Sequence, residues 1–179
     1  MATANVETHP NAITNQGAAP GRAELLARRI EEGANLLAAF AIGISDEEWN
    51  TPISESDRRT VGVVVHHVAS VYQVEVQLAQ AIAHGNSVAE VTWEVVNRMN
   101  GEHASAQASV TKDDALALLR KNSQEAADAV RAFTDKELDT AGSFGLSYGA
   151  PVTAQFAIED HALRHSWHHL ARIRKAINR

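Results

Sequence analysis

Histidine is the residue type in this sequence with the clearest capacity for chemistry. The chain has nine histidines among its 179 residues; four lie between His161 and His169, and His66 and His67 are adjacent. Cysteine is absent, which excludes thiolate ligands and a cysteine nucleophile. Neutral imidazole binds divalent metal ions through a ring nitrogen. A metal site built from histidine nitrogen, with carboxylate oxygen as the only other strong ligand type, is therefore the first hypothesis.

The segment from Val61 to Ala83 carries the adjacent pair His66 and His67. With a step of about 100° per residue along a helix, the residues within about 60° of His67 are apolar: Val63, Val64, Val71, Val74, Leu78 and Ile82. His66 falls about 100° away, on the side of the helix that carries polar residues: Ser70, Gln73, Gln77 and Gln80. The pattern predicts that His67 faces the core and that His66 faces water.

The same construction separates the histidines of the last helix. His161 and His168 fall among charged residues and are expected on the solvent side, whereas His165 and His169 lie about 40° and 80° from His161, beside apolar residues. Residues four apart lie one above the other on a helix, so His165 and His169 can bind one ion, and His67 on a facing helix would complete the set. The alternative is that these histidines are hydrogen-bonded core residues, because a His-x-x-x-His pair lacking the glutamate of His-Glu-x-x-His is weakly specific.

Length and composition predict one folded domain that binds no nucleic acid. Apolar residues make up 45% and charged residues 21% of the chain, and the formal net charge is −6, so no basic field is available to attract phosphate backbones. No apolar run approaches the roughly 20 residues that span a bilayer, and the N-terminus lacks the features of a signal peptide. We expect a cytoplasmic protein with a disordered tail at residues 1–20, a domain at 21–179 and no membrane partner.

The fold class that the sequence predicts is all-α, a four-helix bundle with long connections. Apolar periodicity and capping signals indicate four principal helices. They also indicate a further helix that is interrupted or kinked at Gly101. The helices are expected at residues 22–40, 61–83, 92–107, 111–133 and 151–177. Pro151 is expected in the first turn of the last helix. The glycine-rich segment 141–149 before it predicts a loop, a small hairpin or a lid.

Several motifs resemble the DinB-like superfamily of metalloenzymes, and the resemblance covers nearly the whole chain after the tail. They are Gly43–Trp49 after the first helix, Arg59–Ala69 with its Thr-Val opening, and His165–Ile173 with its His-x-x-x-His pair; Asn97–Asn100 and Phe133–Leu138 are more generic. The resemblance implies a four-helix bundle and a metal site made of His67, His165 and His169, the same three histidines that the helical faces favour. In this family dimers are common, so a homodimer is possible.

Three neutral histidines leave the charge of the ion uncompensated and at least one coordination position open, as in catalytic sites. The expected cofactor is a divalent ion, Zn, Ni, Fe or Mn, and the expected partner is a small-molecule substrate. The resemblance implies a transferase or isomerase that uses a low-molecular-weight thiol; the alternatives are a metal-dependent hydrolase and a non-catalytic bundle in which the metal or the histidines are structural. Glu75, Glu159 or Asp160 could orient a ligand or act as an acid or base, or could be ordinary helix charges.

Overall fold

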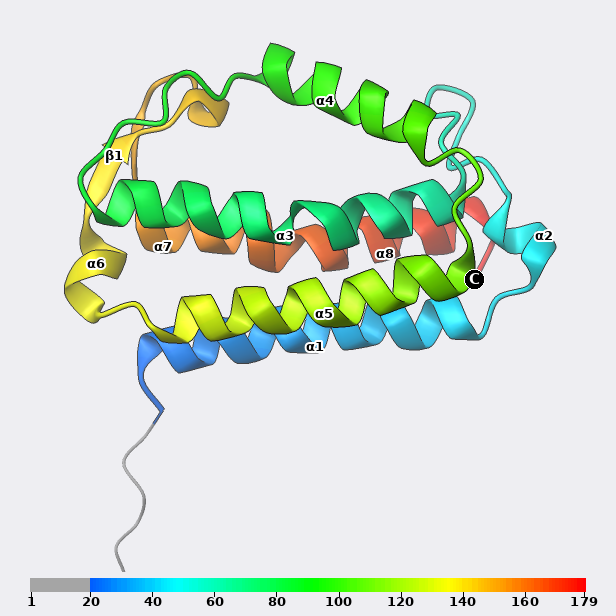
Figure 1. The fold of residues 1–179 in the computed structure, drawn as a ribbon, viewed down its shortest axis with the longest axis horizontal. Helices are drawn as coiled ribbons and strands as arrows, with labels where there is room; N and C mark the ends of the chain where they lie inside the picture. The colour runs from blue at the N-terminus through cyan, green and yellow to red at the C-terminus, as the bar shows by residue number, and fades with distance from the viewer. Residues whose placement is uncertain (1–19) are drawn as a thin grey trace, which may run out of the picture.

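Four rods form the bundle in this computed structural model, two running in one direction and two in the opposite direction (Figure 1). The structure describes residues 20–179, so the tail expected at 1–20 lies outside the described residues apart from Pro20. Three rods are single helices, and the fourth is composite, with a π-helical turn (η2) between two α-helices. The rods are α1 (Arg22–Ile42), α3 (Val61–Ala83), α5 (Lys112–Arg131) and the series α7 (Ala154–Ala157), η2 (Ile158–Leu163) and α8 (Arg164–Ala176). The predicted all-α four-helix bundle is confirmed.

Threonine begins most of the long helices. The hydroxyls of Thr60, Thr92, Thr111 and Thr153 each accept a hydrogen bond from the backbone N–H three residues later, which satisfies one of the amides that a helix start leaves free. Two short helices, α2 (Asp46–Trp49) and α6 (Asp135–Asp139), begin with complete capping boxes. These local signals explain why the helix starts at 61 and 112 could be predicted within a residue.

The core lies between α1, α3, α5 and the composite rod. Leu37, Leu119 and Ile173 from three of these rods are fully buried. Two polar contacts bridge rods within it: the hydroxyls of Tyr72 and Ser166 hydrogen-bond, and the amide of Asn122 donates to a backbone carbonyl of α3 at 2.8 Å. This buried layer fixes α8 against α3, which is the pair of helices that carries the histidines.

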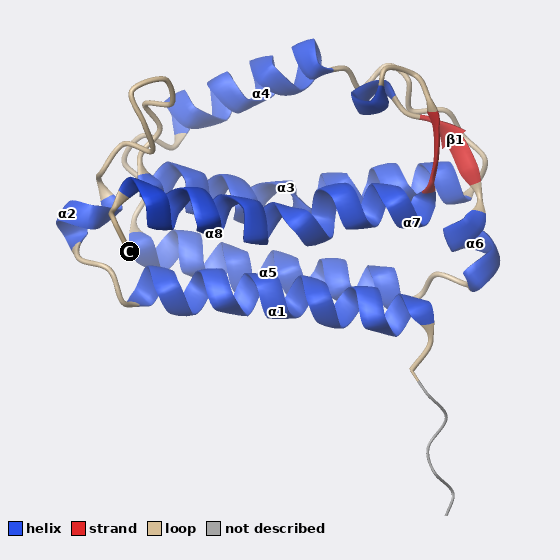
Figure 2. Ribbon diagram, turned by 180° about the vertical axis from the view of Figure 1, so that it is seen from behind, coloured by secondary structure: helices blue, strands red, loops and turns tan. Residues whose placement is uncertain are grey.

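Helix α4 (Trp93–Ala106) lies outside the bundle and runs antiparallel to α3, as the two opposite views show (Figures 1 and 2). None of its residues is buried. The predicted interruption at Gly101 is wrong, because the helix continues through this residue. In the described part of the chain, no helix has both the length and the apolar character that a membrane crossing requires.

A small antiparallel hairpin precedes the composite rod, so the hairpin interpretation of the glycine-rich segment is confirmed. Strands β1 (Ala141–Ser143) and β2 (Pro151–Thr153) pair across a short 3-10 turn, η1 (Gly145–Ser147). Pro151 therefore lies in a strand, and the predicted helix start at this residue is wrong; Thr153 caps the rod instead. Gly145 is required in the turn, since an added Cβ would overlap the backbone carbonyl oxygens of Ala89 and Val91.

Candidate metal centre

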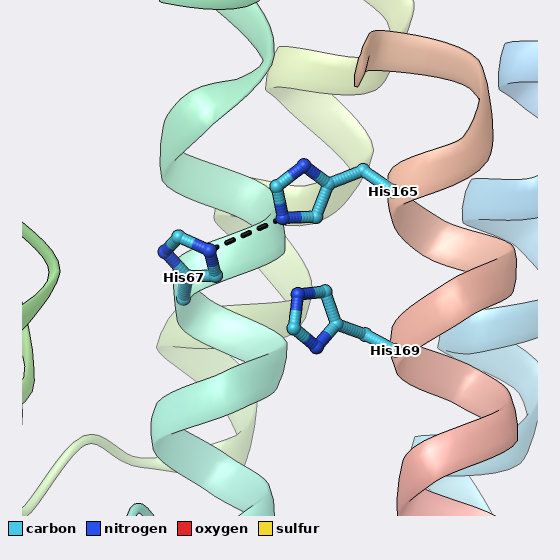
Figure 3. Close-up of side chains that lie close together, drawn as sticks. All are labelled: His67, His165 and His169. Carbon is cyan, nitrogen blue, oxygen red and sulfur yellow. Dashed lines mark hydrogen bonds between the residues drawn. The ribbon is translucent and has the colours of Figure 1, made fainter. Parts of the chain in front are cut away.

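The rings of His67, His165 and His169 point toward one another between α3 and α8 (Figure 3). One nitrogen from each ring lies within 4.8 Å of the others, and His67 Nε2 is 3.1 Å from His165 Nε2. His67 and His169 are buried, and the side chain of His165 is 18% exposed. The structure thus brings together all three histidines that the sequence singled out.

Glu75 holds the ring of His165 from behind. Its Oε1 lies 2.5 Å from His165 Nδ1, and the side chain is buried on α3, two turns after His67. A carboxylate accepts a hydrogen bond from Nδ1–H, which leaves the lone pair of Nε2 directed toward His67. Of the three acidic residues considered from sequence, Glu75 contacts one of the three histidines; Glu159 accepts a hydrogen bond from Gln155, and Asp160 pairs with Arg164.

The donor set fits a divalent metal ion. Two nitrogens that each lie about 2.1 Å from one ion are about 3.0–3.4 Å apart, which matches the separation of His67 and His165. Burial lowers the pKa of His67 to about 3, with a contribution from neighbouring His165, and burial likewise lowers the pKa of His169. Both rings are therefore neutral at physiological pH, the form that binds metals.

Residues 158–163 form a π-helical turn directly before the His165–His169 pair. A π-turn has more residues per turn than an α-helix, so steps of 100° do not carry across it. This explains why the prediction that His161 faces solvent is wrong: its side chain is 13% exposed and packs edge-on against Phe144. His168 lies beyond the turn and is exposed, as predicted.

His66 does not simply face water, because α4 covers its side of α3. Its Nδ1 lies 2.8 Å from Nε2 of His103, and the two rings stack with centroids 5.1 Å apart. His103 was not identified from sequence. Its position seven residues after Val96 placed it on the same face of the 92–107 helix, but the residues of this helix gave no sign of which side faced the bundle.

A pocket of about 430 Å³ opens beside the three histidines, between α3, α4 and the composite rod. This volume is within the range of small-molecule sites. Its wall includes His161 and Trp93, and the Trp93 Nε1–H donates to the Leu146 carbonyl at 2.9 Å. Asn97 and Trp167 do not line it.

A charged network borders the pocket near the N-terminus of α3. Arg59 lines the pocket and donates to both carboxylate oxygens of Asp57, at 2.9 and 2.7 Å, and Arg172 donates to the same carboxylate at 2.8 Å. The hydrogen bond from Arg59, assisted by Arg172, holds the pKa of Asp57 well below its usual range. Two guanidinium groups share one carboxylate, so this border has an excess of positive charge.

Comparison with known proteins gives two findings. A family model described as the DinB superfamily matches residues 29–173. The fold is similar to that of YfiT from Bacillus subtilis, described as "a probable metal-dependent hydrolase with an unusual four-helix bundle topology"; the TM-score is 0.62 at 16% sequence identity, over 90% of this chain and 89% of the other. A comparison with curated proteins gives no match.

Proposed function

The chain belongs to the DinB superfamily, and we propose on this basis that it is a metal-dependent enzyme whose ion is held by His67, His165 and His169. The observation that supports the proposal is the convergence of these rings, with Glu75 behind one of them, at the wall of a pocket large enough for a substrate. A purely structural ion would not need such a pocket.

A divalent ion held by three neutral histidines supplies Lewis acidity that activates water or a substrate group. The residues of the chain do the remaining work. Glu75 accepts a hydrogen bond from the Nδ1–H of His165 and so keeps the Nε2 lone pair of this ring available. Burial of His67 and His169 excludes water from two of the three ligands and keeps their rings in one orientation. Arg59 borders the pocket and favours an anionic group on the substrate.

Hydrolysis is the reaction that we propose to test first, because it is the activity named for YfiT, the structural relative. Transfer or isomerisation with a low-molecular-weight thiol is the second candidate. The chain has no cysteine, so any thiol would have to enter the pocket as a co-substrate. Hydrolase assays with ester and amide panels, each run with and without added glutathione, mycothiol or bacillithiol, separate the two reactions, since only the second requires the thiol.

Metal content tests the proposal directly. The protein should be purified without a nickel column, and its metal measured by mass spectrometry. We expect close to one divalent ion per chain in the wild type and a large loss in His67→Ala and His165→Ala. His84→Ala, at an exposed histidine that ends α3, is the matched control and should retain the ion. Unchanged metal content in both ligand variants would refute the proposed site.

The same variants separate a catalytic ion from one that only holds the bundle together. If the ion serves catalysis, its removal by chelator should abolish activity and leave the unfolding temperature nearly unchanged apart from ordinary ligand linkage. A collapse of the fold on chelation would favour the structural role instead.

A further inference from the structure

The pocket changes character along α3. Arg59 precedes the helix, His67 lies in its second turn, and Val71, Val74 and Leu78 line the pocket farther on. With a rise of 1.5 Å per residue, these three side chains begin about 6, 10 and 16 Å beyond His67. Along this wall the order is therefore cationic, metal-ligating and then mainly apolar; Glu75, which contacts His165, is the polar exception.

Helix α4 shows a similar change from polar to apolar although it runs in the opposite direction. Trp93, Val96 and Met99 line the pocket from its first half, and Asn100 lines it next. His103 follows and hydrogen-bonds to His66, beside the metal ligands. Apart from Glu75, α3 and α4 thus place their apolar lining side chains at one end of the pocket and their polar side chains at the histidine end, while the composite rod adds the polar side chains of Asp160, His161 and Arg164.

The apolar end lacks a cover in the described part of the chain. Val74, Trp93 and Met99 are 43%, 44% and 49% exposed, although all three line the pocket. Exposed apolar side chains that gather in a concave site mark a place where apolar ligand surface is buried. The pocket, at about 430 Å³, has the size for a small molecule and is too small for a protein helix.

We infer that the substrate is an amphiphilic small molecule whose apolar body, an alkyl, acyl or aryl group, lies between α3 and α4 while its polar reacting group meets the three histidines. This inference rests on the proposed function for the reacting end only. The apolar end is independent of the metal, because none of its lining residues is a candidate ligand.

Methionine labelling provides a local probe. The chain has two methionines, and Met99 lies in the pocket wall, so ¹³C-methyl-methionine labelling, with Met99→Leu to assign the signal, gives a probe of the pocket. Zinc-loaded protein would be titrated with straight-chain hydroxamic acids, from acetohydroxamate to octanohydroxamate. The hydroxamate head chelates zinc and the chain samples the apolar end.

We expect affinity to rise about fourfold for each added methylene, the ratio that corresponds to about 0.8 kcal/mol per buried CH₂, until the chain fills the pocket. The Met99 methyl signal should shift with the longer chains. Val74→Asp should weaken octanohydroxamate at least tenfold and leave acetohydroxamate unchanged. Leu25→Asp, at an equally exposed leucine on α1 outside the pocket, is the control and should behave as the wild type.

The outcomes distinguish this inference from the proposed function. If acetohydroxamate binds but affinity is independent of chain length, or Met99 does not respond, the amphiphilic substrate is refuted and the metal site stands. If zinc fails to bind, metal-free protein titrated with octanoate reads the apolar end alone. A Met99 shift would then support the apolar site without the metal. An unchanged spectrum, together with the failure to bind zinc, would refute both the apolar site and the metal site.

Discussion

Replacing Glu75 with glutamine should weaken metal binding without weakening the fold. In the wild type, Glu75 Oε1 lies 2.5 Å from His165 Nδ1, and the second oxygen, Oε2, is buried with no hydrogen-bond partner among the described residues. Glutamine has nearly the same size but no charge, so the contact loses its charge-assisted part. The amide can also turn its NH₂ group toward the ring, which would place the ring proton on Nε2 and block the ligand atom.

The expected magnitude follows from this geometry. Loss of a carboxylate that orients a metal-binding histidine typically weakens metal affinity 10- to 100-fold, which corresponds to about 1.4–2.7 kcal/mol. The free energy of unfolding of the ion-free protein should increase or stay constant, because the variant no longer buries a carboxylate with one unpartnered oxygen. Opposite signs for affinity and stability would identify Glu75 as a residue that positions His165 for the metal.

Two measurements check this prediction. The zinc dissociation constant would be determined by competition with a chromophoric chelator, and the stability of the ion-free protein by urea unfolding in excess chelator. Glu125→Gln, at an exposed residue of α5 that accepts a hydrogen bond from Gln73, is the control. An unchanged zinc dissociation constant in Glu75→Gln would refute the reasoning, as would an equal loss in Glu125→Gln.

Three further predictions concern the surroundings of the site. Asp57→Asn should lower the free energy of unfolding by about 1–2 kcal/mol at pH 7, because two arginines lose their shared carboxylate. Arg59 and Arg172 hold the folded-state pKa of Asp57 below its unfolded value of about 3.9. The stability that the Asp57 carboxylate contributes is therefore present above that value and is lost as the pH falls through the lower folded-state pKa. Urea unfolding from pH 7 to 3 should show the difference in free energy of unfolding between wild type and variant becoming smaller, and a constant difference would contradict this. Gly62→Ala should destabilise the protein by about 1–3 kcal/mol in thermal unfolding, because the added methyl would overlap the Trp49 indole. Gly101→Ala is the control and should be neutral or stabilising, because its added methyl would meet no atom within 4 Å. Equal stability of Gly62→Ala and wild type would refute the packing argument. His103→Ala should speed hydrogen exchange throughout α4 and leave zinc affinity unchanged, because it removes the hydrogen bond to His66 but no candidate ligand; unchanged exchange would show that this bond does not hold the helix.

Most of the fold could be predicted from local sequence signals. Thr60 and Thr111 marked helix starts because a threonine cap acts within three residues, and the apolar face around His67 followed from regular α-helical spacing. The same regularity, together with the family resemblance, singled out His165 and His169. These two lie within a regular helix beyond the π-turn, so their spacing relative to each other was preserved.

The errors arose where geometry depends on distant contacts. The π-turn at Ile158–Leu163 has no sequence signature, so His161 was assigned to the wrong side. Pro151 suits a helix start and an edge strand equally well, and its pairing with Ser143 decided for the strand. The partners of His66 and Glu75 come from other helices, α4 and α8, and a single sequence does not reveal which helix faces which.

The position of α4 outside the core has an evolutionary consequence. The three histidines proposed as metal ligands lie on α3 and α8, whose packing maintains the bundle, whereas α4 supplies part of the pocket wall and no buried residue. Substitutions at Val96 or Met99 would reshape that wall with little effect on folding, but substitutions near His67 or His169 would disturb both the fold and the metal. Descendants of one ancestral bundle could therefore diverge in substrate range through α4 while the three histidines stay the same.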